Sequence, residues 1–416
     1  MREATSGTDR PAAWSPWRVV VGFGTISLAA DMVYEGARSV YGPLLVSLGG
    51  SAVVVGAVTG AGEAAALVLR LVFGPLADHT GRYWTLTIVG YALTAVCVPL
   101  LALTPSLGAA GLGVAAALIV AERIGKAVRS PAKSALLADA AGQVGMGRGL
   151  GVHKALDQIG AFAGPLLVAA LIAVSAGSLV PGLAALAVPG AVALALLVLT
   201  RRRMPAPATA DLHAVATSEP GNTALAQPAT SLTRLAPGFL GLAAGAGLCT
   251  AGLVTFGIIS FHLVTRDLVP TAGVPLLYAG AMASGAVAAL VTGEVYDRIG
   301  GRVLLALPVL VAAVPVLAFA DSLAPVVAGT LLWGAAVGLQ DSTVKALVAD
   351  LVPRPRRATA YGVFAAVQGA GALIGGVGAG ALYQYSIATL TAVVAGTQAA
   401  ALLLLLAVVR RGHSRG

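Results

Sequence analysis

Twelve apolar segments of roughly 20 residues each follow one another along this chain of 416 residues. A helix of about that length spans the hydrocarbon core of a bilayer. Hydrophobic residues make up 58% of the chain and charged residues 10%, so a soluble fold could not bury all of this apolar surface. We therefore expect an all-α membrane protein with twelve transmembrane helices. The expected helices are 18–47, 52–76, 83–103, 108–132, 148–175, 178–200, 236–264, 272–292, 302–320, 324–345, 357–383 and 387–409.

The order of apolar and polar segments divides the chain into two sets of six helices. Between the sets lies 201–235, a stretch rich in Ala, Pro and Thr that opens with three arginines and is typical of a linker. The predicted organisation has a tail (1–17), a first bundle (18–200), the linker (201–235), a second bundle (236–409) and a second tail (410–416).

Basic residues lie almost entirely in alternate loops, which predicts the orientation of the chain. If the N-terminus is cytoplasmic, the outer loops carry only Arg266. This positive-inside pattern places both termini in the cytoplasm and favours the plasma membrane, with the lipid bilayer as partner. It also explains the net charge of +9 without nucleic acid. The basic residues of the inner face are Arg10, Arg18, Arg82, Lys133, Arg148, Arg201, Arg202, Arg203, Arg234, Arg298, Arg302, Arg354, Arg356, Arg357, Arg410 and Arg411.

The two sets of helices share a sequence repeat. The segment 135–139 (ALLAD) recurs at 346–350 (ALVAD), a displacement of 211 residues. Three glycines recur at the same displacement: Gly151, Gly160 and Gly164 correspond to Gly362, Gly371 and Gly375. The repeat predicts two parallel-duplicated six-helix bundles, an architecture in which the halves rock about a central site. Close packing of helices is a second role for these glycines, compatible with the first.

The loop after the second expected helix has a distinctive pattern, with Gly74, Asp78, Gly81 and Arg82 in the order Gly-x-Leu-Ala-Asp-x-x-Gly-Arg. Gly81 permits a turn with positive φ. We expect Asp78 to accept hydrogen bonds from Arg82 or from the N-terminus of a facing helix. A weaker copy in the second half contains Gly293, Asp297, Gly300 and Arg302.

This loop pattern resembles the best-known motif of the major facilitator superfamily, and the resemblance extends over the whole chain. It implies transport by alternating access. It also implies a cytoplasmic gate built from the two loops, with Asp78 and Arg82 acting against the second half. The residues of this gating motif are Gly74, Asp78, Gly81, Arg82, Asp139, Gly293, Asp297, Arg302 and Asp350.

A second pattern is similar to the antiporter motif of the drug:proton antiporters in that superfamily. Gly151, Gly160, Gly164 and Pro165 match it, whereas 168–169 (VA) replace its following glycine pair. Ile119 stands where those antiporters usually carry Arg. The resemblance implies proton-coupled export, by antiport, of a small organic molecule such as a drug or metabolite, and this is the leading function.

Several charged residues fall within the expected helices, where each costs about 2.5–3.5 kcal/mol unless it faces a cavity or a partner. One interpretation is that they bind protons or substrate, with Asp31 and Glu35 as a coupled pair one turn apart. The other is that they form ion pairs, Arg38 neutralising Glu35 and Lys154 neutralising Asp157. For the stripe Glu122, Lys126, Arg129 and Lys133, structure and gating are favoured. The candidate proton or substrate residues are Asp31, Glu35, Arg38, Glu63, Glu122, Lys126 and Asp157.

Other kinds of function find less support in the sequence. There is no P-loop, no catalytic constellation and no metal-binding cluster, so we expect a transporter driven by an ion gradient, with protons as coupling ion, no cofactor and no enzymatic activity. We also expect a monomer that takes one small-molecule substrate. The main alternative is a carrier of organic anions that uses Lys126 to Lys133 with Lys345 opposite. A membrane enzyme or a receptor on a transporter scaffold is the more remote alternative.

Overall fold

The computed structural model describes the backbone of residues 14–204, 237–351 and 357–413, and the side chains of 14–204, 238–343 and 360–410. The expected tail before residue 14, nearly all of the expected linker and the side chains of Lys345 and Asp350 lie outside the described residues.

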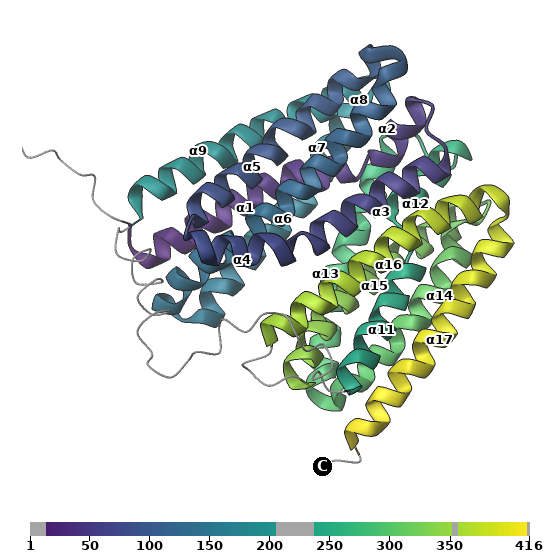
Figure 1. Ribbon diagram of the computed structural model, residues 1–416. Helices are drawn as coiled ribbons and strands as arrows, with labels where there is room; N and C mark the ends of the chain where they lie inside the picture. Colours follow the sequence, from purple (N-terminus) through teal and green to yellow (C-terminus); the bar gives the residue numbers. More distant parts are fainter. Residues whose placement is uncertain (1–13, 205–236, 352–356, 414–416) are drawn as a thin grey trace, which may run out of the picture.

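The first half is a bundle of helices connected by short turns (Figure 1). Ser15 caps the first helix, and Pro16 occupies the first helical position, where its missing N–H costs nothing. Gly81 ends the fourth helix in the left-handed conformation, with φ of 63°. The elements are α1 (Pro16–Arg38), α2 (Tyr41–Ser47), α3 (Ala52–Val68), α4 (Arg70–Thr80), α5 (Tyr83–Leu100), the 3-10 helix η1 (Leu101–Ala110), α6 (Gly111–Val144), α7 (Met146–Val174), α8 (Leu179–Ala185) and α9 (Ala187–Arg203).

The second half repeats this arrangement. Its elements are α11 (Pro237–Gly252), α12 (Phe256–Thr265), α13 (Gly273–Ile299), the 3-10 helix η4 (Gly300–Leu305), α14 (Ala306–Ala318), α15 (Leu323–Leu351), α16 (Arg357–Tyr385) and α17 (Ile387–His413). Its core is one apolar cluster that includes Phe256, Tyr278 and Trp333. The first half has two smaller clusters, one around Tyr41 and one around Phe23.

The number of membrane spans agrees with the expected twelve once joined helices are separated. Ten segments of the described chain are long and apolar enough to cross a membrane. Two of them, Tyr83–Val144 and Gly273–Ala318, each contain two expected helices joined through a 3-10 helix. The expectation of an all-α fold with two six-helix bundles is therefore confirmed.

Some helix boundaries differ from the expected ones. The first expected helix, 18–47, is divided at Ser39 and Val40, where the Ser39 hydroxyl donates a 2.6 Å hydrogen bond to the carbonyl of Gly36. The fourth, 108–132, begins at Gly111 and continues to Val144, so Asp139 lies inside a helix. Pro131 does not end this helix.

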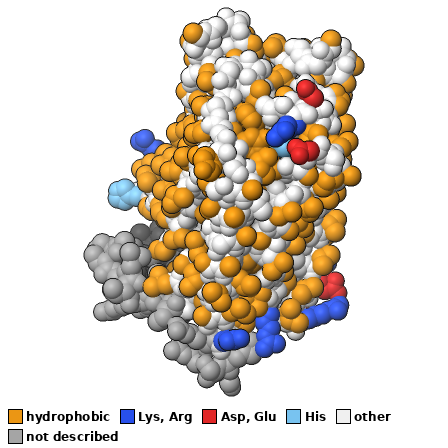
Figure 2. Space-filling view, turned by 90° about the vertical axis from the view of Figure 1, so that its right-hand side faces the viewer, with side chains coloured by type: hydrophobic (Ala, Val, Ile, Leu, Met, Phe, Trp, Pro, Cys, Tyr) orange, Lys and Arg blue, Asp and Glu red, His pale blue; other side chains and the backbone are white. Residues whose placement is uncertain are grey.

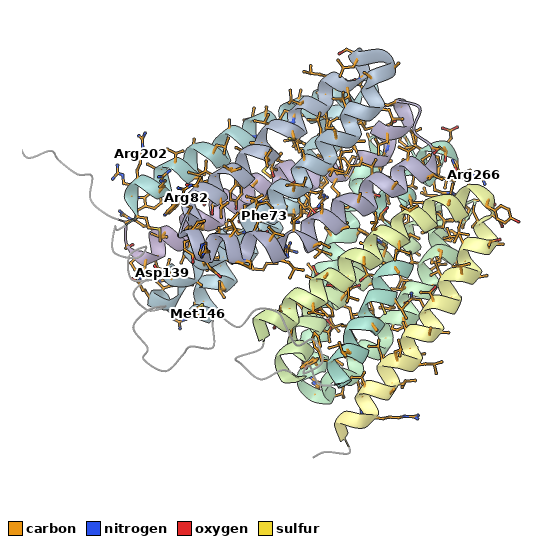
Figure 3. All side chains as sticks on the ribbon, in the orientation of Figure 1. Phe73, Arg82, Asp139, Met146, Arg202 and Arg266 are labelled. Atoms are coloured by element: carbon orange, nitrogen blue, oxygen red, sulfur yellow. The ribbon has the colours of Figure 1, made fainter. Side chains whose placement is uncertain are left out.

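The two halves lie side by side, converging at one end and diverging at the other (Figure 1). Near the converging end, α2 packs against α12, while α3 runs along α16. Glycines bring this last pair close, because a Cβ atom on Gly56 would collide with the carbonyl of Gly376. Arg82, Asp139 and Arg202 lie towards the diverging end, and Arg266 lies at the opposite end (Figure 3).

The outer surface is largely apolar. Figure 2 shows a face on which hydrophobic side chains cover most of the middle, while charged side chains gather near the ends. Val174 and Leu290, exposed at 81% and 77%, belong to this apolar surface. Lipid is the solvent that accommodates such residues.

Candidate functional site: a charged network in the first half

The first half holds a pair of acids from two neighbouring helices. The carboxyl groups of Asp31 on α1 and Asp157 on α7 lie close enough to interact electrostatically. The Nζ atom of Lys154 is 2.6 Å from Oδ2 of Asp157, as the ion-pair interpretation expected. Asp31 therefore faces Asp157. It does not pair with Glu35, as the sequence had led us to expect. The reason is that α1 and α7 pack along their length, whereas Glu35 points to another neighbour.

Glycines allow the two helices of this acid pair to approach. A Cβ atom on Gly160 would collide with the carbonyl of Leu28, and one on Gly164 with the carbonyl of Met32. The repeated glycines of the second half do the same, since Gly371 and Gly375 abut the backbone of α11. The antiporter-like glycines thus have a packing role in both halves.

The two remaining glycines of the repeat do not make these contacts with the first helix of their half. Gly151 has open space where a Cβ atom would lie. Gly362 faces the side chain of Leu71 in the first half, and Pro165 lies buried inside α7.

Glu35 connects the two halves. It accepts a hydrogen bond from the Tyr278 hydroxyl of α13, and its Oε2 atom is 3.9 Å from Nη1 of Arg38. Arg38 has a closer carboxylate, because its Nη2 atom is 2.7 Å from Oε1 of Glu63 on α3. Arg38 therefore pairs first with Glu63, and its expected pairing with Glu35 is the weaker of the two.

A second arginine, which the sequence stripe did not include, completes this network. Arg123 on α6 is 3% exposed and lies 3.6 Å from Glu63 and 3.4 Å from Glu122. It also donates a hydrogen bond to the hydroxyl of Tyr34 on α1. Arg123 thus connects acids on two helices.

Tyr34 is the common neighbour of three basic side chains. Its hydroxyl also accepts a 3.2 Å hydrogen bond from Arg38. The guanidinium carbon of Arg123 lies 4.2 Å from the ring centroid, and the Nζ atom of Lys126 lies 3.8 Å from it. Aromatic rings attract cations in this way. The sequence could have indicated this role of Tyr34, because Tyr34 lies one turn from Arg38 on the charged face of the first helix.

Arg129 and Lys133, in the C-terminal part of the charged stripe on α6, form hydrogen bonds within the first half. Arg129 donates a 2.6 Å hydrogen bond to Thr94, whose hydroxyl is 3.3 Å from Glu122. Lys133 donates a 3.0 Å bond to Ser27, which also bonds His153. These bonds are compatible with the structural part of the role predicted for the stripe, and gating by the stripe stays a prediction.

A small hollow of about 20 Å³ lies where this network meets the second half. Its first-half wall carries charge, and the hydroxyl of Thr59 is 2.9 Å from that of Thr255 across the boundary. Behind Phe256 on the opposite wall stand Tyr278 and Trp333, whose rings contact it. The lining residues are Arg38, Tyr41, Thr59, Glu63, Ile119, Arg123, Thr255, Phe256 and Gly257.

The loop motif lies away from this network. Asp78 accepts a 3.0 Å hydrogen bond from the Tyr83 hydroxyl, so the expected bond from Arg82 is replaced. The reason is the left-handed turn at Gly81, which directs the start of α5 back towards the end of α4. In the second half Gly293, Asp297 and Arg302 are exposed near the end of α13, and Gly300 has a φ of 62°.

Comparisons with known proteins agree with this architecture. Two uncharacterized proteins, from Mycobacterium tuberculosis and Mycobacterium bovis, are each 49% identical to the chain over 411 residues, covering 97% of the chain and 95% of the relative. An uncharacterized MFS-type transporter of Methanocaldococcus jannaschii is 28% identical over 145 residues, 35% of each chain.

Solved structures share the fold at low sequence identity. A nucleoside transporter, NupG, superimposes with a TM-score of 0.69 at 15% identity, covering 94% of this chain and 99% of that one. A peptide transporter, POT, in complex with sulfate gives 0.70 at 16%, covering 95% and 94%. The family model of the Major Facilitator Superfamily matches residues 23–320 and 258–416. Together with the duplicated bundles, this match shows that the chain is a membrane transporter belonging to the Major Facilitator Superfamily.

Proposed function

We propose that this transporter couples the movement of a small organic molecule to protons, by alternating access, in the plasma membrane with both termini in the cytoplasm. The observation that carries the proposal is the acid pair Asp31 and Asp157. Two neighbouring carboxylates at low dielectric repel each other, and a proton bound by the pair would relieve that repulsion. A change in the access of water to this pair would load or release that proton.

Lysines around the acid pair support release as well as binding. Lys154 bonds Asp157 and is 66% exposed on its side chain, while Lys126 and Lys133 act electrostatically on Asp31. Nearby positive charge stabilises the ionised carboxylate. When the proton leaves, these lysines can therefore balance the negative charge that remains on the acid pair.

The conformation fits one state of an alternating-access cycle. The halves diverge towards the end that carries Arg82 and Arg202, which the distribution of basic residues assigns to the cytoplasm (Figures 1 and 3). In the central region the halves are joined by the bonds of Glu35 with Tyr278 and of Thr59 with Thr255. This is the arrangement expected of an inward-facing transporter.

Two versions of the proposal differ in substrate and direction. Export by antiport is favoured by the antiporter-like glycine spacing, although close helix packing also accounts for Gly160, Gly164, Gly371 and Gly375. Carriage of an organic anion is favoured by the basic side chains near the hollow. The names of the solved structures mention different substrates, nucleosides in one case and peptides in the other. The shared fold therefore does not select between export by antiport and carriage of an organic anion.

A paired growth and uptake screen tests proton coupling. An efflux-deficient bacterium expressing the wild type, Asp31→Asn or the outer-surface control Asp321→Asn at matched membrane levels is scored for tolerance and for uptake across a compound panel. We expect at least one compound to respond to the wild type and the control but not to Asp31→Asn.

Once such a compound is found, counterflow separates coupling from binding. Proteoliposomes holding Asp157→Asn should exchange labelled for unlabelled compound but should not accumulate it against a gradient when a pH difference is imposed. Uphill accumulation equal to that of the wild type would contradict the acid pair as the proton site.

A further inference from the structure

Two half-buried basic side chains of the first half, Lys126 and Arg70, have neither an ion pair nor a side-chain hydrogen bond among the described side chains. Lys126 contacts the ring of Tyr34, and among the described side chains it forms neither a hydrogen bond nor an ion pair. Arg70, at the start of α4, has a buried Nε atom without a hydrogen-bond partner and likewise forms no ion pair with a described acid. Both side chains are half-buried.

Other bases of the region are held by oxygen atoms of the protein. Arg38 and Arg123 share Glu63, while Arg129 bonds Thr94 and Lys133 bonds Ser27. An uncompensated positive charge is unfavourable in a membrane interior, so it persists where a function requires it. A bound anion would supply the missing negative charge.

The two cations do not line the hollow, but both act on residues that do. Lys126 shares the ring of Tyr34 with Arg123, which lines the hollow, and both Lys126 and Arg70 act electrostatically on Glu63 in the same lining. The Tyr41 hydroxyl, also in the lining, is buried without a hydrogen-bond partner. Among the described side chains, the region therefore offers two cations without a direct ion pair and one hydroxyl group without a hydrogen-bond partner.

The opposite wall has a different chemistry. Phe256 lines the hollow from the second half, and Tyr278 and Trp333 pack behind it. A ligand that satisfies both walls has a negatively charged group and an apolar part.

We infer that the substrate is a small organic anion whose carboxylate or phosphate group binds between Lys126 and Arg70, with its apolar part against Phe256. This inference rests on the proposed proton-coupled transport and names its substrate class. Charge-assisted bonds from lysine and arginine are the strong contacts by which proteins hold such groups.

The position of Lys126 also sets the direction of coupling. Lys126 lies close enough to Asp31 for its positive charge to interact with that carboxyl group. An anion bound at Lys126 offsets that charge and so favours the protonated acid. By thermodynamic reciprocity, a proton on the acid pair strengthens anion binding. Anion and proton then travel in the same direction, as symport.

Thermal unfolding of the purified full-length protein tests the substrate class. The probes are matched pairs that differ in charge: benzoate and benzamide, uridine monophosphate and uridine, glucose 6-phosphate and glucose. We expect an anion to raise the melting temperature where its neutral partner does not. Lys126→Gln should weaken its binding by about 10-fold, whereas the control Arg266→Gln, on the outer surface, should not. Stabilisation only by the neutral members, or equal anion binding by Lys126→Gln, would overturn the inference.

A second measurement does not depend on finding the ligand. In a protein lacking Cys97 and Cys249, a cysteine introduced by Thr59→Cys reacts with methanethiosulfonate reagents of either charge. We expect the anionic reagent to react faster relative to the cationic one, and Lys126→Gln to reduce that ratio several-fold. A ratio that favours the cationic reagent, or that Lys126→Gln leaves unchanged, would contradict an anion site.

The outcomes separate this inference from the proposed function. If Asp31→Asn binds the anion but pH no longer affects transport, both stand. If the wild type binds an anion and carries it without protons, proton coupling fails and the anion site remains. If protons are coupled to a neutral or cationic substrate, the anion site fails alone.

Discussion

The hydroxyl of Tyr278 donates a hydrogen bond to Glu35, and the two residues belong to opposite halves of the molecule. The bond joins α13 to α1 beside the hollow, and Glu35 is also within 3.9 Å of Arg38. Opening of the end at which the halves converge requires such cross-half contacts to rearrange. The Glu35 carboxylate therefore links the charged network to the relative position of the two halves.

Tyr278→Phe is expected to favour the alternative, outward-open conformation. It removes a hydrogen bond to a charged group, which contributes about 1.5–3 kcal/mol, so the population should shift roughly 10-fold or more. Labelling of Thr59→Cys by an impermeant reagent added outside cells measures the shift. Tyr383→Phe is the matched control, because Tyr383 bonds His262 within the second half. Equal labelling of both variants would contradict a role for Tyr278 in holding the halves together.

Asp341→Lys is expected to have the opposite effect. Asp341 on α15 is exposed and acts electrostatically on Arg70 and Lys154 of the first half. A lysine there would oppose their approach when the diverging ends close, and outside labelling of Thr59→Cys should fall several-fold. Asp321→Lys serves as the control, because Asp321 pairs with Arg266 at the end opposite to Arg82. A rise in labelling with Asp341→Lys would disprove this placement of the inner charges.

Gly160→Leu is expected to destabilise the first half severely. The new side chain would collide with the carbonyl of Leu28 and separate α1 from α7, at a cost of about 3 kcal/mol or more. Gly151→Ala is the control, because it has open space and gains about 0.5–1 kcal/mol of helix propensity. Thermal unfolding in detergent distinguishes them. A stable Gly160→Leu protein would show that close contact is not the role of this glycine.

Glu63→Gln is expected to destabilise the protein by about 3 kcal/mol, because Arg38 and Arg123 would lose their shared carboxylate. The double variant Glu63→Gln with Arg38→Gln should recover part of that loss, since it removes one of the two arginines that lose a carboxylate partner. Unfolding temperatures of the single and double variants form the measurement. If the double variant is as unstable as the sum of both single ones, the pair is not coupled.

Much of the fold was predictable because membrane insertion depends on local composition. A window of about 20 residues is enough to recognise each membrane span. The duplication is recognised from repeated segments that lie 211 residues apart. The turn at Gly81 was also predictable, since its left-handed conformation depends on one residue. The division of the first span at Ser39 was missed, because the apolar run continues across it.

The partners of the charged residues were harder to predict. Helical spacing showed that Asp31, Glu35 and Arg38 share a face of one helix, but not which helix lies opposite. Arg123 falls outside the stripe that begins at Glu122, yet it is buried, because α6 packs against α1, α3, α5 and α7 and so has several covered faces.

The sequence by itself therefore determined the spans, the duplication and the presence of charges within the membrane, since these depend on residues near one another in the chain. Only the tertiary structure decided that Asp31 meets Asp157 and that Glu35 meets Tyr278, residues 243 positions apart. These contacts depend on which helix faces pack together. In a membrane, that packing is set by the fit of small residues such as Gly160 against a neighbouring backbone.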